Sequence, residues 1–336
     1  MGGLTARLLG ILAAVLAATL AGCMDITEYG ALWSWRVEVL AIPDLSVLGA
    51  VSGVEGGQEV LPLGEAVFLV SSLEGVVYRC SAGEMAVMDT WRLSDALSGG
   101  CSDMVASPCT TSFYVIASSE MMYEVDALDG SILASVSPAD IPTVLGAGLD
   151  GEHIYISDGP TGWVYELFCP GNYAERAVQC ERSPVLMEPL DLGPGYILLV
   201  CPDSRGTVYF LNLDSFQTVK WESGSSCTGA AEMNDSMWAM ARPEWTQSSG
   251  SVLLCRGVDY SIDSREIPFD SRPQRVCWEE YSDLLYVGSR TDDGNTLISA
   301  WSPESSQVTA EVKLDGFLQD MAVTPGESRL IVLLYE

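Results

Sequence analysis

Beyond residue 33, the apolar residues of this chain fall in short runs that alternate with polar positions. Val, Ile, Tyr, Phe and Leu dominate these runs, and turns rich in Gly, Ser, Asp and Pro separate them. No long segment repeats its apolar residues at the 3.6-residue spacing of an amphipathic helix. The pattern is typical of many short β-strands and predicts an all-β protein.

The strand pattern repeats along the chain. Asp103–Val115 and Asp320–Val332 share the pattern D-M-x-x-[ST]-P-x-x-[ST]-x-[FL]-x-V without a gap. Five looser copies of this 13-residue frame begin at Gln58, Val144, Glu188, Thr228 and Arg275. Successive frames begin 40 to 47 residues apart, with four strand-like runs in each interval. A period of this length with four strands per unit is typical of a β-propeller blade.

The two ends of the chain complete the repeat. The seventh frame reaches Glu336 after only two strands, while two strand-like runs at 36–42 and 47–51 precede the first frame without partners of their own. Pairing them closes the ring and leaves no open sheet edge within it. The sequence therefore predicts a seven-bladed β-propeller of four-stranded blades, whose last blade joins N-terminal strands to C-terminal strands. A pair of β-sandwiches is the alternative fold, but it does not require such a period.

Residues 1–22 have the organisation of an export signal. Arg7 precedes an apolar run, Leu8–Leu20, which is shorter than the roughly 20 residues of a transmembrane helix. The run leads into L-A-G-C at 20–23, which resembles the lipobox of bacterial lipoproteins. The resemblance implies that Cys23 is lipidated and begins the mature chain; the alternative is an ordinary signal peptide or an uncleaved anchor. We divide the chain into a lipoprotein signal peptide (1–22), a lipidated cysteine with a short tether (23–32) and a propeller (33–336).

The charge balance narrows the choice of partners. The chain has 16 Lys and Arg against 46 Asp and Glu, a formal net charge of −30. Nucleic-acid binding relies on a basic surface, so we exclude a nucleic-acid partner. An anionic membrane surface also repels this chain, so contact with a membrane must come through the lipid anchor. We expect a membrane-anchored lipoprotein of the cell envelope, on a periplasmic or extracellular face.

Several blade segments resemble a known superfamily. Leu285–Ser289 (L-Y-V-G-S) and Met122–Gly130 (M-Y-E-V-D-A-L-D-G) are similar to repeats of the YVTN-type and quinoprotein-like seven-bladed propellers. The Trp-Asp and Gly-His signatures of WD40 repeats are missing from the sequence. Quinoproteins and lactonases belong to this superfamily, but none of their functional residues can be matched onto this chain. Kinship of fold alone does not confer chemistry.

Nine of the ten cysteines remain after Cys23, an odd number for an exported protein. Alignment of the repeats assigns three of them to small apolar core positions: Cys80, Cys255 and Cys277. Two disulfides are possible beside free thiols: Cys201–Cys227 between adjacent blades, and Cys169–Cys180 around the turn region of one blade.

The sequence contains no recognisable catalytic set. His153, the single histidine, falls inside a predicted strand, so we interpret it as structural rather than as a general base. Gly146–Gly151 matches G-x-G-x-x-G, but a strand follows it where a dinucleotide site needs a helix. We assign no catalytic residue and no metal ligand. The turn Arg242–Gly250 carries Trp245 as a possible partner contact, with packing onto its own blade as the alternative.

The first residues of the seven frames should surround the central channel. Four of them are charged: Asp103, Glu188, Arg275 and Asp320. A narrow, partly desolvated mouth should perturb their pKa values. In one interpretation the ring is structural, with Arg275 paired to Asp320 and the acids satisfied by water. In the other, Asp103, Glu188 and Asp320 hold a polar ligand or a cation, for which calcium is a suitable match. No other cofactor is implied.

These features favour a non-catalytic binding or scaffold protein, anchored by lipid in the cell envelope. Its expected partner is an envelope protein or a polar ligand on one of the loop faces. The alternative is an envelope hydrolase or lactonase-like enzyme that uses the channel-mouth carboxylates.

Overall fold

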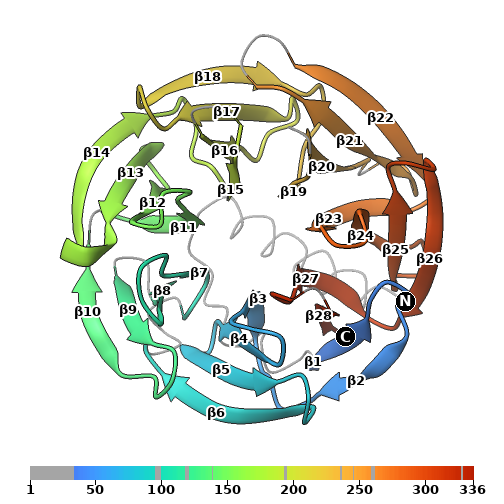
Figure 1. The fold of residues 1–336 in the computed structure, drawn as a ribbon, viewed down its shortest axis with the longest axis horizontal. Helices are drawn as coiled ribbons and strands as arrows, with labels where there is room; N and C mark the ends of the chain where they lie inside the picture. Colours follow the sequence, from blue (N-terminus) through green and yellow to red (C-terminus); the bar gives the residue numbers. More distant parts are fainter. Residues whose placement is uncertain are drawn as a thin grey trace, which may run out of the picture.

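The computed structural model describes residues 34–94, 100–117, 121–137, 139–192, 195–234, 237–244, 246–258, 262–326 and 328–336. Within these residues, 28 strands form seven antiparallel sheets of four strands each. The sheets stand around a common axis like the blades of a propeller, in chain order (Figure 1). The predicted seven-bladed, all-β architecture is confirmed.

Each blade runs from an axial first strand to a peripheral fourth strand. The first three blades are β3 (Gly57–Pro62), β4 (Val67–Ser72), β5 (Val76–Ser81), β6 (Ala86–Arg92); β7 (Met104–Ala106), β8 (Ser112–Ile116), β9 (Met122–Asp126), β10 (Ile132–Val136); and β11 (Pro142–Ala147), β12 (His153–Asp158), β13 (Trp163–Phe168), β14 (Tyr173–Gln179). The next three are β15 (Leu186–Leu190), β16 (Tyr196–Val200), β17 (Thr207–Asn212), β18 (Gln217–Glu222); β19 (Gly229–Glu232), β20 (Met237–Pro243), β21 (Gly250–Arg256), β22 (Asp263–Phe269); and β23 (Arg272–Glu279), β24 (Leu284–Arg290), β25 (Thr296–Ser302), β26 (Gln307–Leu314). Blade 7 is β27 (Phe317–Val323), β28 (Arg329–Tyr335), β1 (Trp35–Ala41) and β2 (Val47–Val51).

Blade 7 closes the ring in the predicted way. Strand β1 pairs antiparallel with β28 along its whole length, from Trp35 opposite Tyr335 to Ala41 opposite Arg329. The Ser34 amide donates to the Glu336 carbonyl at 3.1 Å, and the Glu336 amide donates back to Ser34 at 2.9 Å. Figure 1 shows the blue N-terminal strands beside the red C-terminal strand in one sheet.

The hydrophobic core is divided among the seven contacts between neighbouring blades. One cluster joins blades 7 and 1 through residues such as Val39, Phe68 and Ile331, all fully buried. Neighbouring blades cover both faces of the inner strands, so β24 is buried at every position before its last residue. The peripheral β26 keeps an exposed face and alternates instead. This explains why the sequence shows continuous apolar runs next to alternating ones.

The predicted lipidation site, Cys23, and the N-terminal signal lie outside the described residues. Within the part of the chain that the structure describes, no helix is long and apolar enough to cross a membrane.

Candidate functional site

The first strands of the blades surround the axis of the propeller (Figure 1), and four charged residues lie on these strands or directly beside them. Asp320 lies on β27, Arg275 on β23 and Glu188 on β15, while Asp103 directly precedes β7. Arg275 Nε lies 3.3 Å from Asp320 Oδ1, which is the ion pair expected by the structural interpretation of the ring. Arg275 also donates from Nη1 to the Thr228 carbonyl at 2.8 Å, so this one guanidinium links blades 5, 6 and 7.

The frame assigns the wrong residue of blade 1 to the ring. Met104 and Met321, each one residue after a frame start, pair with Val115 and Val332, while in blade 1 the equivalent pair is Val60 with Val70. The residue equivalent to Asp103 and Asp320 is therefore Glu59, and Gln58 instead donates to the carbonyl of Gly57 at 2.8 Å. A register irregularity between Gly57 and Val60 causes the shift, and the 13-residue frame contains no signal for it.

Each axial carboxylate accepts a backbone hydrogen bond from the next blade. Asp320 Oδ2 accepts from the Val60 amide at 2.9 Å, Glu59 accepts from the Met104 amide, and Asp103 Oδ2 accepts from the Leu145 amide at 2.5 Å. In this way three acids tie blades 7, 1, 2 and 3 together in sequence. Glu188 makes the same kind of contact with blade 5, because its Oε1 accepts from the Glu232 amide at 3.2 Å.

The acids of the ring hold protons more tightly than free side chains do. Burial raises the pKa of Glu59 well above its usual value, and the negative charge of Asp103 raises it further. Burial also raises the pKa of Asp103 to about 6, although a hydrogen bond from Glu59 lowers it again in part. The Glu59 and Asp103 carboxyl groups are in side-chain hydrogen-bond contact, which raises the pKa of Glu59 and lowers that of Asp103. Burial raises the pKa of Asp320 as well, opposed by the Arg275 charge.

Glu188 stands apart from the other predicted ligands. Burial raises its pKa to about 8, and among the described residues the carboxylate that adds to this effect is Glu232. Asp103 and Asp320, in contrast, both interact electrostatically with Glu59. The structure thus brings Asp103 and Asp320 together with Glu59 and Arg275, and it places Glu188 with Glu232.

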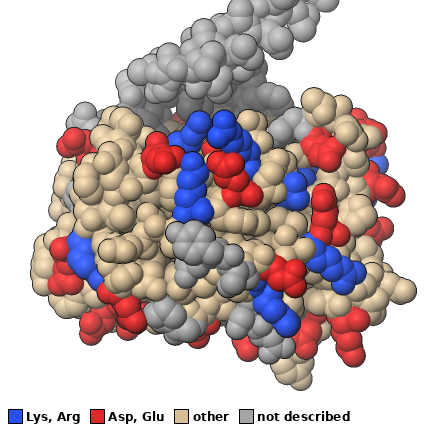
Figure 2. All heavy atoms as spheres, turned by 90° about the horizontal axis from the view of Figure 1, so that it is seen from above, with Lys and Arg blue, Asp and Glu red and all other residues tan. Residues whose placement is uncertain are grey.

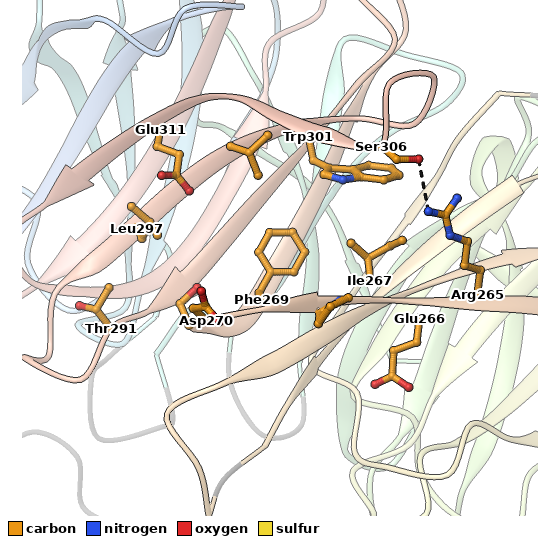
Figure 3. Close-up of a pocket in the computed structure, with 13 residues that line it drawn as sticks. Arg265, Glu266, Ile267, Phe269, Asp270, Thr291, Leu297, Trp301, Ser306 and Glu311 are labelled. Carbon is orange, nitrogen blue, oxygen red and sulfur yellow. Dashed lines mark hydrogen bonds between the residues drawn. The ribbon is translucent and has the colours of Figure 1, made fainter.

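A second site lies at the periphery, in a recess between blades 5 and 6 that the sequence did not indicate (Figure 3). The recess holds about 470 Å³ and opens along the outer strand β22. Figure 3 shows Ile267, Phe269 and Trp301 gathered at its centre, with Glu311 and Asp270 toward one end and Arg265 at the other. A neighbouring recess of about 230 Å³ shares Arg265 and Trp301 with it.

Polar contacts fix the two ends of this recess, which we call the β22 recess. Arg265 donates from Nη2 to Ser306 Oγ at 3.3 Å, and Glu311 Oε1 accepts from Ser299 Oγ at 2.9 Å. The apolar residues come from β22 and β25, which are about 30 residues apart in the chain. The Trp301 side chain packs in the cluster between blades 5 and 6. Only the arrangement of two blades shows that it also lines a recess.

His153 lies among carboxylates on blade 3. Its Nδ1 is 2.5 Å from Asp150 Oδ2, and its Nε2 is 3.3 Å from Glu175 Oε2. With Glu166, the residues His153 and Glu175 bring three ligand-type atoms within 4.8 Å of one another. However, the buried Glu166 is already held by both the Arg176 guanidinium and the Tyr155 hydroxyl. Arg176 therefore supplies the positive charge here, and we assign a structural role to the cluster.

The cysteines among the described residues are free thiols, and the positions of four of them separate both of the pairs that the sequence left open. Cys169 follows β13 at the end where Phe168 pairs with Tyr173, whereas Cys180 follows the other end of the hairpin, where Trp163 pairs with Gln179. Strands of this length hold the two sulfurs far beyond disulfide reach, so the Cys169–Cys180 pairing is wrong.

The other proposed pair is also separated. Cys201 packs with Cys180 in the cluster between blades 3 and 4. Cys227 belongs to the cluster between blades 4 and 5, together with Cys255. The Cys201–Cys227 bridge is therefore absent as well, while Cys80 and Cys255 occupy the core positions predicted for them. Cys277 is half-buried, and its thiol donates to the Met321 carbonyl at 3.1 Å.

The predicted contact at Trp245 lies outside the described residues. Arg242, three residues earlier, is largely buried: its Nε donates at 2.6 Å to Ser225 Oγ, in the connection between blades 4 and 5, and its Nη1 lies 3.8 Å from Glu266 Oε2 of its own blade.

Comparison with known proteins finds similar folds among solved structures. No protein-family model and no curated protein sequence matches this chain. Among solved structures, hydrazine synthase of Kuenenia stuttgartiensis superposes with a TM-score of 0.67 at 12% identity, covering 82% of this chain and 92% of that one. The Pan2 WD40 domain of Neurospora crassa gives 0.64 at 11% identity, with coverages of 83% and 88%. The WD40 repeats of RRP9 give 0.63 at 12% identity, with coverages of 89% and 100%. At such identities the likeness is one of fold alone.

Proposed function

We propose that this chain is a lipid-anchored, non-catalytic binding propeller of the cell envelope, which holds a basic and partly apolar segment of another protein in the β22 recess. The observation that carries the proposal is the recess itself, with aromatic and aliphatic side chains at its centre and carboxylates at its margin. Pockets of several hundred Å³ with an apolar floor and a few fixed polar groups are the usual form of binding sites.

The charge of the recess selects the partner. Its lining includes Glu266, Asp270 and Glu311 against a single cation, Arg265, which already contacts Ser306. The whole chain carries a formal charge of −30 and attracts cationic partners over a distance. A suitable partner is therefore an extended segment whose apolar residues contact Phe269 and Trp301 and whose Lys or Arg pairs with Glu311.

Matched peptides and matched variants test the recess. One peptide alternates Lys with Leu, and the second replaces every Lys by Glu. We expect the Lys peptide to bind and Val308→Lys, in the recess, to weaken binding about tenfold or more, because it adds a like charge and removes apolar surface. Val47→Lys is the control, since Val47 is also an exposed valine on a peripheral strand and changes the net charge equally. Equal affinities of the two variants would show that the peptide binds by general charge attraction.

The lipid anchor has its own test. Cys23→Ser removes the predicted acylation site, so we expect the protein to leave the detergent phase on phase separation, whereas Cys109→Ser should stay in it. Detergent partitioning that Cys23→Ser leaves unchanged would overturn the anchor, without bearing on the recess.

One observation favours the alternative, a carboxylate-dependent hydrolase. Glu59 and Asp103 are two acids in side-chain hydrogen-bond contact whose pKa values are both raised by burial, an arrangement also found in the paired acids of several hydrolytic enzymes. Both acids, however, also accept hydrogen bonds from backbone amides of the neighbouring blade, which gives them a structural function. A panel of ester, lactone and glycoside substrates decides the matter: a rate that Glu59→Gln abolishes, without a change in folding, would replace the binding proposal.

A further inference from the structure

Two thiols from different blades meet beside Tyr114. Cys109 lies in the turn between β7 and β8 of blade 2, and Cys169 begins the short η2 turn (Cys169–Gly171) of blade 3. The two thiols are in hydrogen-bond contact, and the Tyr114 hydroxyl is within electrostatic range of both sulfurs. The sequence offers no signal for this pair, because 59 residues separate its members and the repeat frame aligns them to different positions.

The surroundings hold this contact in place. Tyr114 donates to the Cys169 carbonyl at 3.5 Å and to Asn172 Oδ1 at 2.9 Å. Asn172 in turn donates from Nδ2 to Glu124 Oε2 at 2.7 Å, which links the η2 turn back to blade 2. On the other side, Ser107 Oγ lies 3.6 Å from Cys109 Sγ. A network from two blades therefore positions both cysteines.

We propose that Cys109 and Cys169 form a disulfide that joins blade 2 to blade 3 when the chain reaches an oxidising compartment. The inference rests on the envelope location proposed above, because disulfides form and persist in exported proteins. It replaces the two pairings suggested by the sequence and uses the contact between sulfurs that the fold creates.

The exposure of the two thiols sets the order of the reaction. Among the described cysteines, Cys109 is the exposed one. Cys169 is 3% exposed, and burial raises the pKa of its thiol to about 12, so it is a poor first nucleophile. The Cys109 thiolate attacks a disulfide oxidant, forms a mixed disulfide and releases one thiolate of the oxidant. Cys169 then loses its proton to that thiolate, attacks Cys109 Sγ and expels the second thiolate. The two cysteines lose two electrons, and the oxidant leaves as a dithiol or as two thiols.

The test uses the full-length protein, extracted from envelopes in detergent with an alkylating agent and without reductant. Proteolysis and mass spectrometry should recover a Cys109–Cys169 peptide, which reductant and the Cys109→Ser variant both remove. Reductant should also lower the Tm of the wild type by about 5 °C and leave that of Cys109→Ser unchanged, because the bond closes a long loop. Cys277→Ser is a matched control that should retain the cross-link.

The outcomes separate this inference from the envelope location. If the protein is in the detergent phase and both thiols are alkylated, the disulfide is wrong and the location stands. If the protein is absent from envelopes, purified protein treated with oxidised glutathione decides: a linked peptide supports the pairing, and thiols that remain alkylatable overturn it.

Discussion

The carboxylates at the axis hold neighbouring blades together. Glu59, Asp103 and Asp320 each accept a hydrogen bond from a backbone amide of the next blade. These side chains join neighbouring blades at the axis, in addition to the pairing of β1 with β28 that completes blade 7. A buried carboxylate that accepts a backbone hydrogen bond need not be charged to do so. This is consistent with the raised pKa values of these groups.

Glu188 allows a direct test of that role through pH. Its pKa is about 8 in the folded protein and near 4.5 in the unfolded chain, so the folded state keeps a proton that the unfolded state loses between these values. The stability from this group is therefore complete below about pH 4.5 and declines as the pH rises toward 8. Between pH 5 and pH 8, we expect the Tm of the wild type to fall by roughly 6 °C more than that of Glu188→Gln.

The Gln variant is informative because its amide oxygen can still accept from the Glu232 amide. Thermal melts at half-unit pH intervals measure the difference between the two proteins, and other titrating groups contribute equally to both. Parallel curves for wild type and Glu188→Gln would show that Glu188 titrates normally in the folded state.

At the scale of the strand, the 13-residue frame was informative because the first two strands of every blade meet the same constraints. Both are covered by neighbouring blades, so Asp103–Val115 and Asp320–Val332 retain the same apolar positions. The frame could not show Glu59, because the irregularity between Gly57 and Val60 is decided by local backbone geometry. It could not show the β22 recess or the contact of Cys109 with Cys169, because each combines residues of two blades.

Closure by β1 predicts a strong dependence on that strand. Val39 is fully buried in the cluster between blades 7 and 1, so Val39→Asp places an unpaired charge there and should cost about 3 kcal/mol or more. Leu48→Asp is the matched control on β2, where the side chain is 48% exposed, and it should cost less than about 0.5 kcal/mol. Urea titrations of both variants measure these values.

Deletion of residues 34–51 extends the same test to the whole element. Removing β1 and β2 exposes the edge of β28, so the truncated chain should aggregate or lose its cooperative transition. A truncated protein that elutes as a monomer and melts like the parent would contradict closure of the ring by these strands.

At the scale of the whole molecule, acidic side chains are spread over the face that Figure 2 shows, with basic ones beside several of them. In most ion pairs among the described residues at least one side chain is exposed, and both are in the pair of Lys313 with Asp293; exposed pairs contribute only about 0 to 1 kcal/mol each. A formal charge of −30 therefore leaves a large net repulsion. Added salt shortens the screening length from about 30 Å at 0.01 M to about 8 Å at 0.15 M. We expect NaCl to raise the Tm over this range, because it screens more repulsion between the acidic side chains than attraction between acidic and basic ones.

Thermal melts in two salts also test whether the axial ring binds calcium. Arg275 already supplies a positive charge to Asp320, and burial raises the pKa values of Glu59 and Asp103, which favours their neutral forms. We therefore expect CaCl2 and NaCl at equal ionic strength to give the same Tm within about 1 °C, both in the wild type and in Asp103→Asn/Asp320→Asn. The double variant should melt lower than the wild type throughout, because it loses the charge that pairs with Arg275, so the informative quantity is the shift on adding calcium. A wild-type Tm that calcium raises above the NaCl value, and a double variant without that rise, would assign a cation to Asp103 and Asp320 and make the ring a ligand site.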